Sequence, residues 1–243
     1  MSRILLLSLA LFSVYGVIPS IVSRRLGVGV FREGCTSDGI AFTFDDGPDP
    51  IYTPKLLDLL KKHNIKATFF VLGSKAERFP HLIRRMHHEG HLIGVHNYVH
   101  RCNWFLTPRT VRQNLKHTVS IIEKTTGERP VFYRPPWGLL NIFDFFLVRK
   151  NYKIVLWSLM VGDWRSKGGS KRIEIKILDK LSPGALIVLH DSGETWGADE
   201  DAPLHMIKAL ESVFQEIHHR GWKCVRVDKM IGLSNRVEKS KVS

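Results

Sequence analysis

Beyond residue 38 the chain alternates short apolar runs with longer amphipathic segments, and this rhythm constrains its fold more than any other feature. Apolar runs of four to six residues are typical of buried strands, and the segments of ten to twenty residues between them have the spacing of helices. The alternation predicts an α/β domain built on a parallel sheet.

The expected strands cover residues 40–44, 67–71, 92–95, 131–133, 154–157, 185–189 and 224–227. The expected helices lie near residues 53–64, 75–89, 107–126, 141–151, 170–181 and 203–220. Seven strands with six helices between them favour a barrel-like single domain. An open doubly wound sheet is the alternative, but no G-x-G-x-x-G motif follows the first strand, which argues against a dinucleotide site.

Two of the expected helices begin at a Thr-Pro pair. Thr53 precedes Pro54, and Thr107 precedes Pro108. Threonine is a good N-cap and proline suits the first helical position, so both threonines are expected to cap their helices.

The first 25 residues contain an uncharged run, Ile4–Val22, that is long enough to cross a bilayer as a helix. No Ala-x-Ala site follows it, so we expect an uncleaved membrane anchor over residues 1–25. A cleaved signal and a buried helix are the alternatives. Arg3 lies on one side of the run and Arg24 with Arg25 on the other, so charge alone does not decide the orientation.

The charge of the chain bears on its partners. Its 36 Lys and Arg against 23 Asp and Glu give a net charge of +13, and 44% of its residues are hydrophobic. This composition excludes a disordered chain, and the scattered basic residues argue against a nucleic-acid partner. We interpret them as a surface suited to anionic lipids or wall polymers. Three cysteines without a C-x-x-C pair exclude a closed disulfide framework.

Two carboxylates end the first expected strand. Asp45 and Asp46 are adjacent, so they point to opposite sides and could take different roles, one binding a metal and one handling a proton. An Asp-rich turn is the simpler alternative. The third strand runs into His96 and His100, an H-x3-H pair that can bind a divalent metal from one face of a helical turn.

A second histidine pair has the same spacing. His87 and His91 precede the third strand, on the rim that should lie opposite the two aspartates. The position of His96 and His100 after the strand, rather than their spacing, therefore marks them as the candidate ligands.

Three further expected strands end at residues whose side chains could take part in catalysis. The fourth runs into Arg134-Pro-Pro-Trp137, where the prolines leave the Trp137 N–H as the first free backbone donor, able to meet an oxyanion. Arg134 could keep a carboxylate ionised. The fifth strand leads to Asp163 and Trp164, and the sixth to His190. In α/β barrels the active site lies at this edge of the sheet.

Together these motifs resemble the polysaccharide deacetylases of carbohydrate esterase family 4, the NodB-homology domain. The matching motifs are Thr43-Phe-Asp-Asp-Gly-Pro48, His96-Asn-Tyr-Val-His100, Arg134-Pro-Pro-Trp-Gly138, Asp163-Trp164 and Leu189-His190. The resemblance covers about residues 39–230. It implies a deformed (β/α) barrel of about seven parallel strands, and metal-dependent removal of N-acetyl or O-acetyl groups from sugar polymers such as peptidoglycan or chitin-like oligosaccharides.

The resemblance implies a role for each motif residue. The implied metal ligands are Asp46, His96 and His100. Asp45 is the implied general base and His190 the general acid, with Arg134 holding Asp45 and Asp163 orienting His190. The implied substrate and oxyanion contacts are Trp137, Trp164 and Leu189. Zinc is the expected divalent ion, with cobalt, manganese or nickel as alternatives.

The chain departs from the family pattern at two positions. Asn97 stands where Ser or Thr is usual, and it can still hydrogen-bond the loop. Met160 stands where many members carry an acidic residue, which bears on the partner of His190.

The leading hypothesis is an extracytoplasmic deacetylase of acetylated glycans, anchored by its N-terminal hydrophobic helix or secreted if that segment is cleaved. We expect one catalytic domain over residues 38–232 and a basic tail over residues 233–243. A catalytically silent glycan-binding module and a non-haem iron enzyme with the same two histidines and one carboxylate are the alternatives.

Overall fold

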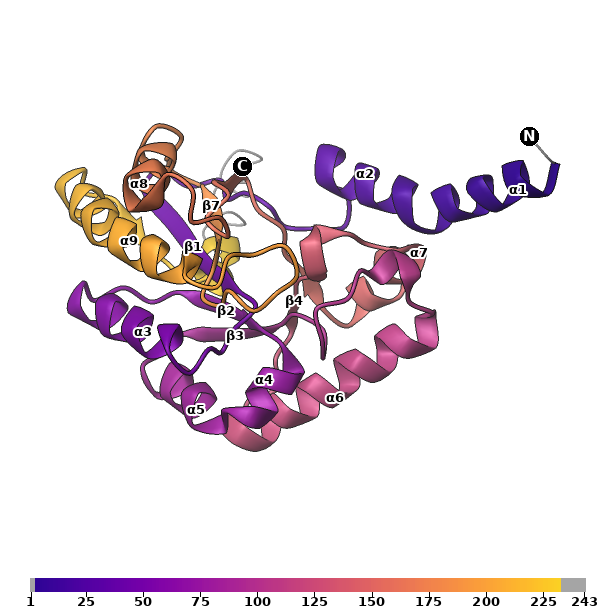
Figure 1. Cartoon of the computed structure of the whole chain (residues 1–243), viewed down its shortest axis with the longest axis horizontal. Helices are drawn as coiled ribbons and strands as arrows, with labels where there is room; N and C mark the ends of the chain where they lie inside the picture. The colour runs from indigo at the N-terminus through magenta and orange to yellow at the C-terminus, as the bar shows by residue number, and fades with distance from the viewer. Residues whose placement is uncertain (1–2, 233–243) are drawn as a thin grey trace, which may run out of the picture.

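The computed structural model describes residues 3–232, and its centre is one parallel sheet. Seven strands follow one another in the order β5-β4-β3-β2-β1-β7-β6, and β8 pairs with the start of β1. The strands are β1 (Gly39–Asp45), β2 (Thr68–Val71), β3 (Leu92–Val95), β4 (Phe132–Tyr133), β5 (Lys153–Ile154), β6 (Leu159–Met160), β7 (Leu186–His190) and β8 (Lys223–Cys224). The α/β class and the parallel sheet are confirmed (Figure 1).

The sheet curls into an incomplete barrel. β5 and β6 end the path of strands, and no pairing joins them within residues 3–232. Phe31, which precedes β1, bridges to Val155 and extends the β5 edge. The predicted deformed barrel is confirmed as a curled half-barrel. β6 was not expected, because Leu159 and Met160 follow closely on the apolar run at 154–157 and no turn signal separates the two.

Helices cover the outside of the sheet. They are α3 (Tyr52–Lys62), α4 (Gly73–Arg78), α5 (Pro80–His88), α6 (Pro108–Thr126), α7 (Ile142–Phe146), α8 (Gly169–Leu178) and α9 (Ala202–His219), with 3-10 turns at Asn103–Phe105, Pro136–Gly138 and Val148–Lys150. The helix expected at 75–89 is split at Phe79, which precedes a proline and leaves the helical conformation. The Thr107 N-cap is confirmed, because its hydroxyl accepts from the Thr110 N–H at 3.2 Å.

The predicted N-cap at Thr53 is wrong. Asp49 accepts the Tyr52 N–H at 2.9 Å, and α3 begins at Tyr52, so Thr53 lies inside the helix. The Thr53 hydroxyl instead accepts from the Asp49 N–H at 2.7 Å and donates to the buried Asp191 carboxylate. An Asx-type turn has taken over the capping role.

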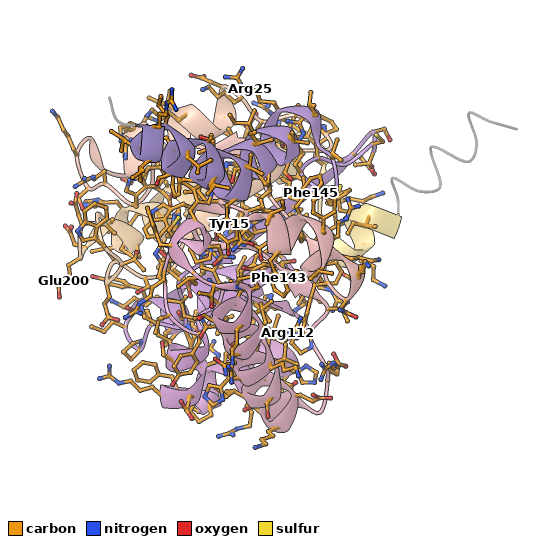
Figure 2. The ribbon with its side chains drawn as sticks, turned by 90° about the vertical axis from the view of Figure 1, so that its right-hand side faces the viewer. Tyr15, Arg25, Arg112, Phe143, Phe145 and Glu200 are labelled. Atoms are coloured by element: carbon orange, nitrogen blue, oxygen red, sulfur yellow. The ribbon has the colours of Figure 1, made fainter. Side chains whose placement is uncertain are left out.

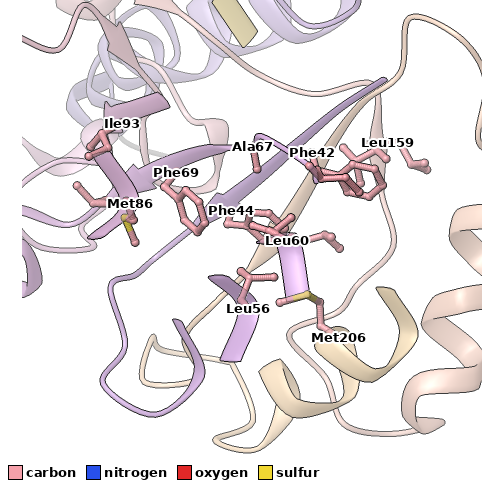
Figure 3. Close-up of a cluster of buried hydrophobic side chains, with 14 of the residues drawn as sticks. Phe42, Phe44, Leu56, Leu60, Ala67, Phe69, Met86, Ile93, Leu159 and Met206 are labelled. Carbon is pink, nitrogen blue, oxygen red and sulfur yellow. The ribbon is translucent and has the colours of Figure 1, made fainter. Parts of the chain in front are cut away.

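β1 is buried along its whole length and separates two apolar layers. Phe42 and Phe44 belong to the layer beneath the helices (Figure 3). The Phe42 ring meets that of Phe214 on α9 with their centroids 5.1 Å apart. Thr43 and Asp45 alternate with them and point into the half-barrel. The alternation therefore delivers one carboxylate to the inside of the sheet at its carboxyl edge.

A continuous helical segment opens the chain. It comprises α1 (Arg3–Phe12), a π-helical stretch (Ser13–Val17) and α2 (Ile18–Leu26). Among the described residues it is the one helix whose length and mean hydropathy of 2.2 would allow it to cross a membrane. α1 has no buried residue and projects beyond the rest of the molecule (Figure 1).

The second half of this helix packs against the domain. Ser20 is buried, and its hydroxyl donates to the Leu140 carbonyl at 2.8 Å and accepts from the Leu140 N–H at 2.9 Å. The Tyr15 hydroxyl donates to the Leu106 carbonyl, and Figure 2 shows Tyr15 on the side of the helix that faces the domain. The basic tail predicted over residues 233–243 lies outside the described residues.

Candidate active site

The predicted site residues gather at the carboxyl edge of the sheet. Asp45 ends β1 and His190 ends β7, while His96 and Arg134 directly follow β3 and β4. A cavity of about 450 Å³ opens at this edge. Its lining includes the predicted residues Asp46, His96, His100, Trp137, Trp164 and His190.

Asp45 and Arg134 form a buried ion pair beneath the cavity. Arg134 Nη1 lies 2.7 Å from Asp45 Oδ1, and Arg134 is completely buried. The guanidinium also donates to the Thr43 hydroxyl at 2.7 Å and to the backbone carbonyls of Val155 and Leu156 at 3.1 and 2.9 Å. All these bonds fix the plane of the guanidinium, which in turn fixes the Asp45 carboxylate.

Asp46, His96 and His100 form the group of described residues that could hold a metal ion. Asp46 Oδ1 lies 3.3 Å from His96 Nε2 and 3.4 Å from His100 Nε2. Asp46 has a φ of 74°, a left-handed conformation that turns its side chain away from that of Asp45. Adjacent aspartates on one strand end thus face two different sets of partners.

The protonation states of this group suit a divalent metal. The His96 Nδ1–H donates to the Arg134 carbonyl at 2.7 Å, because a carbonyl can only accept, and this leaves Nε2 free as a ligand. Burial lowers the pKa of His100 to about 4, although Asp46 opposes this shift. Burial alone would raise the pKa of Asp46, but the hydrogen bond and charges of the neighbouring histidines hold it well below its ordinary value.

Two buried atoms of the same group have no hydrogen-bond partner among the described residues: Asp46 Oδ1 and His100 Nδ1. An unpaired buried carboxylate oxygen that faces two imidazole nitrogens is costly unless a cation occupies the space between them. One carboxylate and two neutral imidazoles are donors that zinc and similar divalent ions accept. The donor set therefore fits the metal that the family resemblance implies.

His190 faces the cavity with Asp163 behind it. His190 Nδ1 lies 3.1 Å from Asp163 Oδ1, and the His190 backbone N–H donates to Asp163 Oδ2 at 2.7 Å. Burial opposes the charged imidazole, but Asp163 and the carboxylates of Asp46 and Asp45 outweigh it and raise the pKa of His190 to about 10. Asp163 is therefore the partner of His190, and Met160 is a half-exposed residue of the cavity wall.

Asn97 holds the histidine loop in place. Its side chain donates to Asn103 Oδ1 at 2.8 Å and accepts from the Tyr133 hydroxyl at 3.0 Å. Its backbone has a φ of 65°, a conformation that asparagine tolerates better than Ser or Thr. The expected hydrogen bonding of Asn97 to the loop is confirmed.

Aromatic residues line the mouth of the cavity. The Trp137 ring lies edge-on to His100 with their centroids 4.1 Å apart, and Trp164 stands edge-on to His190 at 5.5 Å. Leu189, expected to contact substrate, is instead fully buried in the core. Side chains alternate along β7, so its neighbours Val188 and His190 line the cavity and Leu189 points away.

Sequence reasoning missed two residues on the loop after β7. The Thr195 hydroxyl donates to Asp46 Oδ2 at 2.8 Å, and Trp196 is 89% exposed at the cavity mouth. Neither belongs to a motif, and no spacing rule links Thr195 to Asp46 across the chain. The available signal was a tryptophan within the otherwise polar run of residues 190–201.

The second histidine pair lies elsewhere, as its position predicts. His91 is buried, and its Nδ1 accepts from the Ala67 N–H at 3.1 Å. Burial lowers the pKa of His91 to about 4, and His87 lies 3.9 Å from the exposed Glu128. This pair is therefore not part of the Asp46 group, because the His91 ring bonds to the Ala67 backbone and His87 lies near Glu128.

Comparisons with known proteins agree with the geometry. The polysaccharide deacetylase family model matches residues 34–142. A peptidoglycan-N-acetylglucosamine deacetylase of Bacillus cereus is 35% identical over 198 residues, which cover 80% of this chain and 69% of that protein. A chitooligosaccharide deacetylase of Sinorhizobium fredii is 32% identical, with coverage of 79% and 91%. The chain spans only 40% of the Listeria monocytogenes deacetylase PgdA, to which it is 33% identical.

Solved structures of peptidoglycan deacetylases have the same fold as this chain. The crystal structure of a peptidoglycan N-acetylglucosamine deacetylase superposes with a TM-score of 0.78 and 32% identity, covering 86% of this chain and 95% of that one. The peptidoglycan deacetylase PdaC of Bacillus subtilis gives a TM-score of 0.75 and 29% identity, with coverage of 85% and 96%. The chain therefore belongs to the polysaccharide deacetylase family, whose members are metal-dependent hydrolases, as its five motifs predict.

Proposed function

We propose that this protein removes N-acetyl groups from the amino sugars of peptidoglycan. Relatives named peptidoglycan-N-acetylglucosamine deacetylase and peptidoglycan-N-acetylmuramic acid deacetylase are 35% and 33% identical to it. One observation carries the chemistry: the buried Asp45–Arg134 pair lies directly beside the Asp46 metal group, and His190 shares the same cavity. A base, a metal site and an acid thus meet at one place.

Asp46, His96 and His100 would hold the metal, and zinc is the proposed ion because its usual ligands are such nitrogen and oxygen donors. A divalent ion held by these three residues would lower the pKa of a water molecule and polarise the acetyl carbonyl.

Asp45 is the proposed general base. Its carboxylate accepts a proton from the water that attacks the acetyl carbon, while Arg134 keeps it ionised and oriented. The charge that develops on the acetyl oxygen meets the backbone N–H of Trp137, which follows two prolines in a tight turn. Trp164 offers an aromatic face for the sugar ring.

His190 is the proposed general acid. Asp163 accepts from Nδ1–H, so Nε2 carries its proton on the cavity side, and the raised pKa keeps the ring protonated at neutral pH. As the C–N bond breaks, His190 donates this proton to the sugar nitrogen. The products are acetate and a free amino sugar.

We further propose that the protein works outside the cytoplasm and is held at the membrane by its N-terminal helix. The helix from Arg3 to Leu26 has the length and hydropathy of a membrane segment, and its first half is the part free to enter lipid, because Tyr15 and Ser20 in the second half bond to the domain. The side chains of Ile4 and Leu7 are 78% and 62% exposed, which suits a lipid environment. Membrane fractionation, with mass spectrometry of the mature N-terminus, tests this proposal and detects cleavage.

Acetate release tests the enzymatic proposal. Purified protein is assayed on peptidoglycan, chitin oligomers and acetylated xylan, after chelation and after restoration with zinc, cobalt, manganese or nickel. We expect metal-dependent release from peptidoglycan, its loss in Asp45→Asn, and its retention in Asp58→Asn, which changes an exposed carboxylate on α3. Glycan binding without acetate release under every metal would instead indicate a silent binding module, and oxygen uptake would indicate an iron enzyme.

A further inference from the structure

The N-terminal helix ends at the active-site cavity. Arg24, in the last turn of α2, lines this cavity together with Trp157 and Met160. Arg24 also lines a neighbouring cavity of about 280 Å³, where Arg32 joins it. The proposed membrane anchor therefore supplies part of the wall of the active site.

Several contacts hold this end of the helix in place. Trp104 Nε1 donates to the Ser20 hydroxyl at 2.9 Å. The helix can approach Trp104 closely because residue 16 is glycine, since a Cβ there would lie 2.8 Å from Trp104 Cγ. Arg32 Nη1 donates to the Arg24 carbonyl at 2.6 Å, just before the helix ends. The backbone of Arg24 is therefore fixed relative to the cavity.

The Arg24 side chain lies against an aromatic ring that also contacts the catalytic machinery. The guanidinium carbon of Arg24 is 5.2 Å from the centroid of the Trp157 ring, and that of Arg134 is 5.6 Å from the same centroid. Trp157 has little freedom, because a Cβ on Gly138 would come within 2.7 Å of its ring. A cation is thus held one aromatic ring away from the buried guanidinium that positions Asp45.

The charges around Arg24 favour an anion. Within residues 3–232, neither Arg24 nor Arg32 forms an ion pair with a carboxylate, and the cavity that they share has no acidic residue in its lining. In the active-site cavity the one acidic lining residue is Asp46, which belongs to the metal group. The free edge of a guanidinium matches the two oxygens of a carboxylate.

We propose that Arg24, supported by Arg32, binds the carboxylate of an acidic sugar next to the residue that is deacetylated. This inference rests on the proposed function and narrows its substrate class to glycans that carry carboxylates. In peptidoglycan strands that have lost the stem peptide, the lactyl ether of N-acetylmuramic acid carries a free carboxylate, whereas in strands that keep the stem this carboxyl group is an amide. Neutral chitin oligomers offer the same acetamide without it.

The test compares two substrates of equal length: oligomers of alternating N-acetylglucosamine and N-acetylmuramic acid, and chitin oligomers. In Arg24→Gln we expect KM to rise about three- to tenfold for the acidic oligomer, as for a partly exposed charge-assisted contact. KM for chitin oligomers and kcat for both should stay unchanged. The effect should shrink at high salt and on methyl esterification of the lactyl carboxylates.

Arg25→Gln is the matched control. It removes the same charge one residue away from an exposed position at the edge of the molecule (Figure 2). We expect it to leave both KM values unchanged. Arg24→Lys keeps the charge but loses the planar contact, so it should retain part of the preference for the acidic oligomer.

Three results would overturn the proposal. If Arg24→Gln raised KM equally for both oligomers, Arg24 would only support the position of Trp157. If Arg25→Gln raised KM for the acidic oligomer as much as Arg24→Gln does, the effect would be a general electrostatic attraction. If Arg24→Gln lost binding to anionic phospholipid vesicles but kept the ratio of the KM values for the two oligomers, Arg24 would be a contact for lipid phosphate. If the wild type released no acetate from either oligomer, the proposed function itself would fail, and calorimetric binding of the two oligomers would still decide the role of Arg24.

Discussion

Arg134 Nη1 and Asp45 Oδ1 lie 2.7 Å apart, with the guanidinium fully buried and the carboxylate side chain 4% exposed. The pair is held by further hydrogen bonds from the guanidinium to Thr43 and to two backbone carbonyls. A buried ion pair of this kind adds little net stability, because both charges lose their hydration. Its presence at the inner end of β1 is therefore better explained by the position that it gives to the Asp45 carboxylate.

Removing one residue of the Asp45–Arg134 pair should lower the free energy of unfolding more than removing both. We expect Arg134→Met to lower the free energy of unfolding by about 3–5 kcal/mol, because it leaves a buried carboxylate without a cation. Adding Asp45→Asn to that variant should restore part of the loss. Denaturant unfolding of the two single variants and the double variant measures this coupling, and additive losses would mean that the pair does not interact.

Metal binding separates the two histidine pairs. We expect His96→Gln to weaken metal affinity by more than about 100-fold and to abolish acetate release, because a ligand is lost. His87→Gln, from the pair with the same spacing, should bind metal like the wild type. Metal content after dialysis against a weak chelator checks both variants. Equal metal loss in the two would contradict the assignment of the site.

The hydroxyl of Thr195 should tune this site without binding the metal. It donates to Asp46 Oδ2 at 2.8 Å, which leaves Oδ1 to face the two histidines. Thr195→Val keeps the shape of the side chain and removes this bond, so we expect metal affinity to fall about tenfold with little change in unfolding. Titration with zinc measures the affinity, and an unchanged value would show that Asp46 is oriented by other means.

The sequence predicted most of this site because its residues follow strands. Asp45, His96, Arg134 and His190 each stand at a carboxyl end of a strand, and parallel strands bring such ends to one edge. The same logic correctly set His87 aside, since it precedes its strand. Leu189 shows where a motif alone misleads, because strand alternation turns it into the core.

What escaped prediction depends on contacts between distant segments. Thr195 bonds to Asp46 from a loop whose sequence has no periodicity. Arg24 contacts Trp157 from a helix whose sequence predicts a membrane segment. Thr53 matched a capping pattern, but the Asp49 turn started the helix earlier. Rules based on neighbouring residues predict whether such a residue can cap a helix, bond or carry charge. They cannot predict which distant residue it will contact, and that contact decides its role.

The Asp163–His190 pair predicts a change in the pH profile. A general acid must be protonated, so its pKa sets the alkaline limit of activity. Burial disfavours the charged ring, and Asp163 contributes most to raising the pKa of His190 to about 10. We therefore expect Asp163→Asn to shift the alkaline limb of kcat/KM to lower pH and to reduce its maximum about 100-fold. The profile of acetate release between pH 6 and 10.5 measures both effects. If the maximum of kcat/KM fell but the alkaline limb stayed at the same pH, Asp163 would have a structural role only.

Asp144 links stability to pH within the hydrogen-bond network behind the histidine loop, where Asn103 bonds to both Asp144 and Asn97. Its side chain is completely buried, where Oδ2 accepts from the Asn141 N–H at 3.0 Å and from Asn103 Nδ2 at 2.7 Å. Oδ1 has no partner among the described residues. Burial raises the pKa of Asp144 to about 7, against the opposing effect of these two hydrogen bonds.

The folded protein thus binds the Asp144 proton more tightly than the unfolded chain does, whose aspartates titrate near pH 4. The stabilising contribution is complete below pH 4 and is lost as the pH rises through about 7. A difference of about three pKa units corresponds to at most about 4 kcal/mol. Because Asp144→Asn removes this titration, we expect its free energy of unfolding to change less than that of the wild type between pH 4.5 and 8. Denaturant unfolding at several pH values measures the difference, and parallel curves for the two proteins would show that Asp144 is ionised throughout.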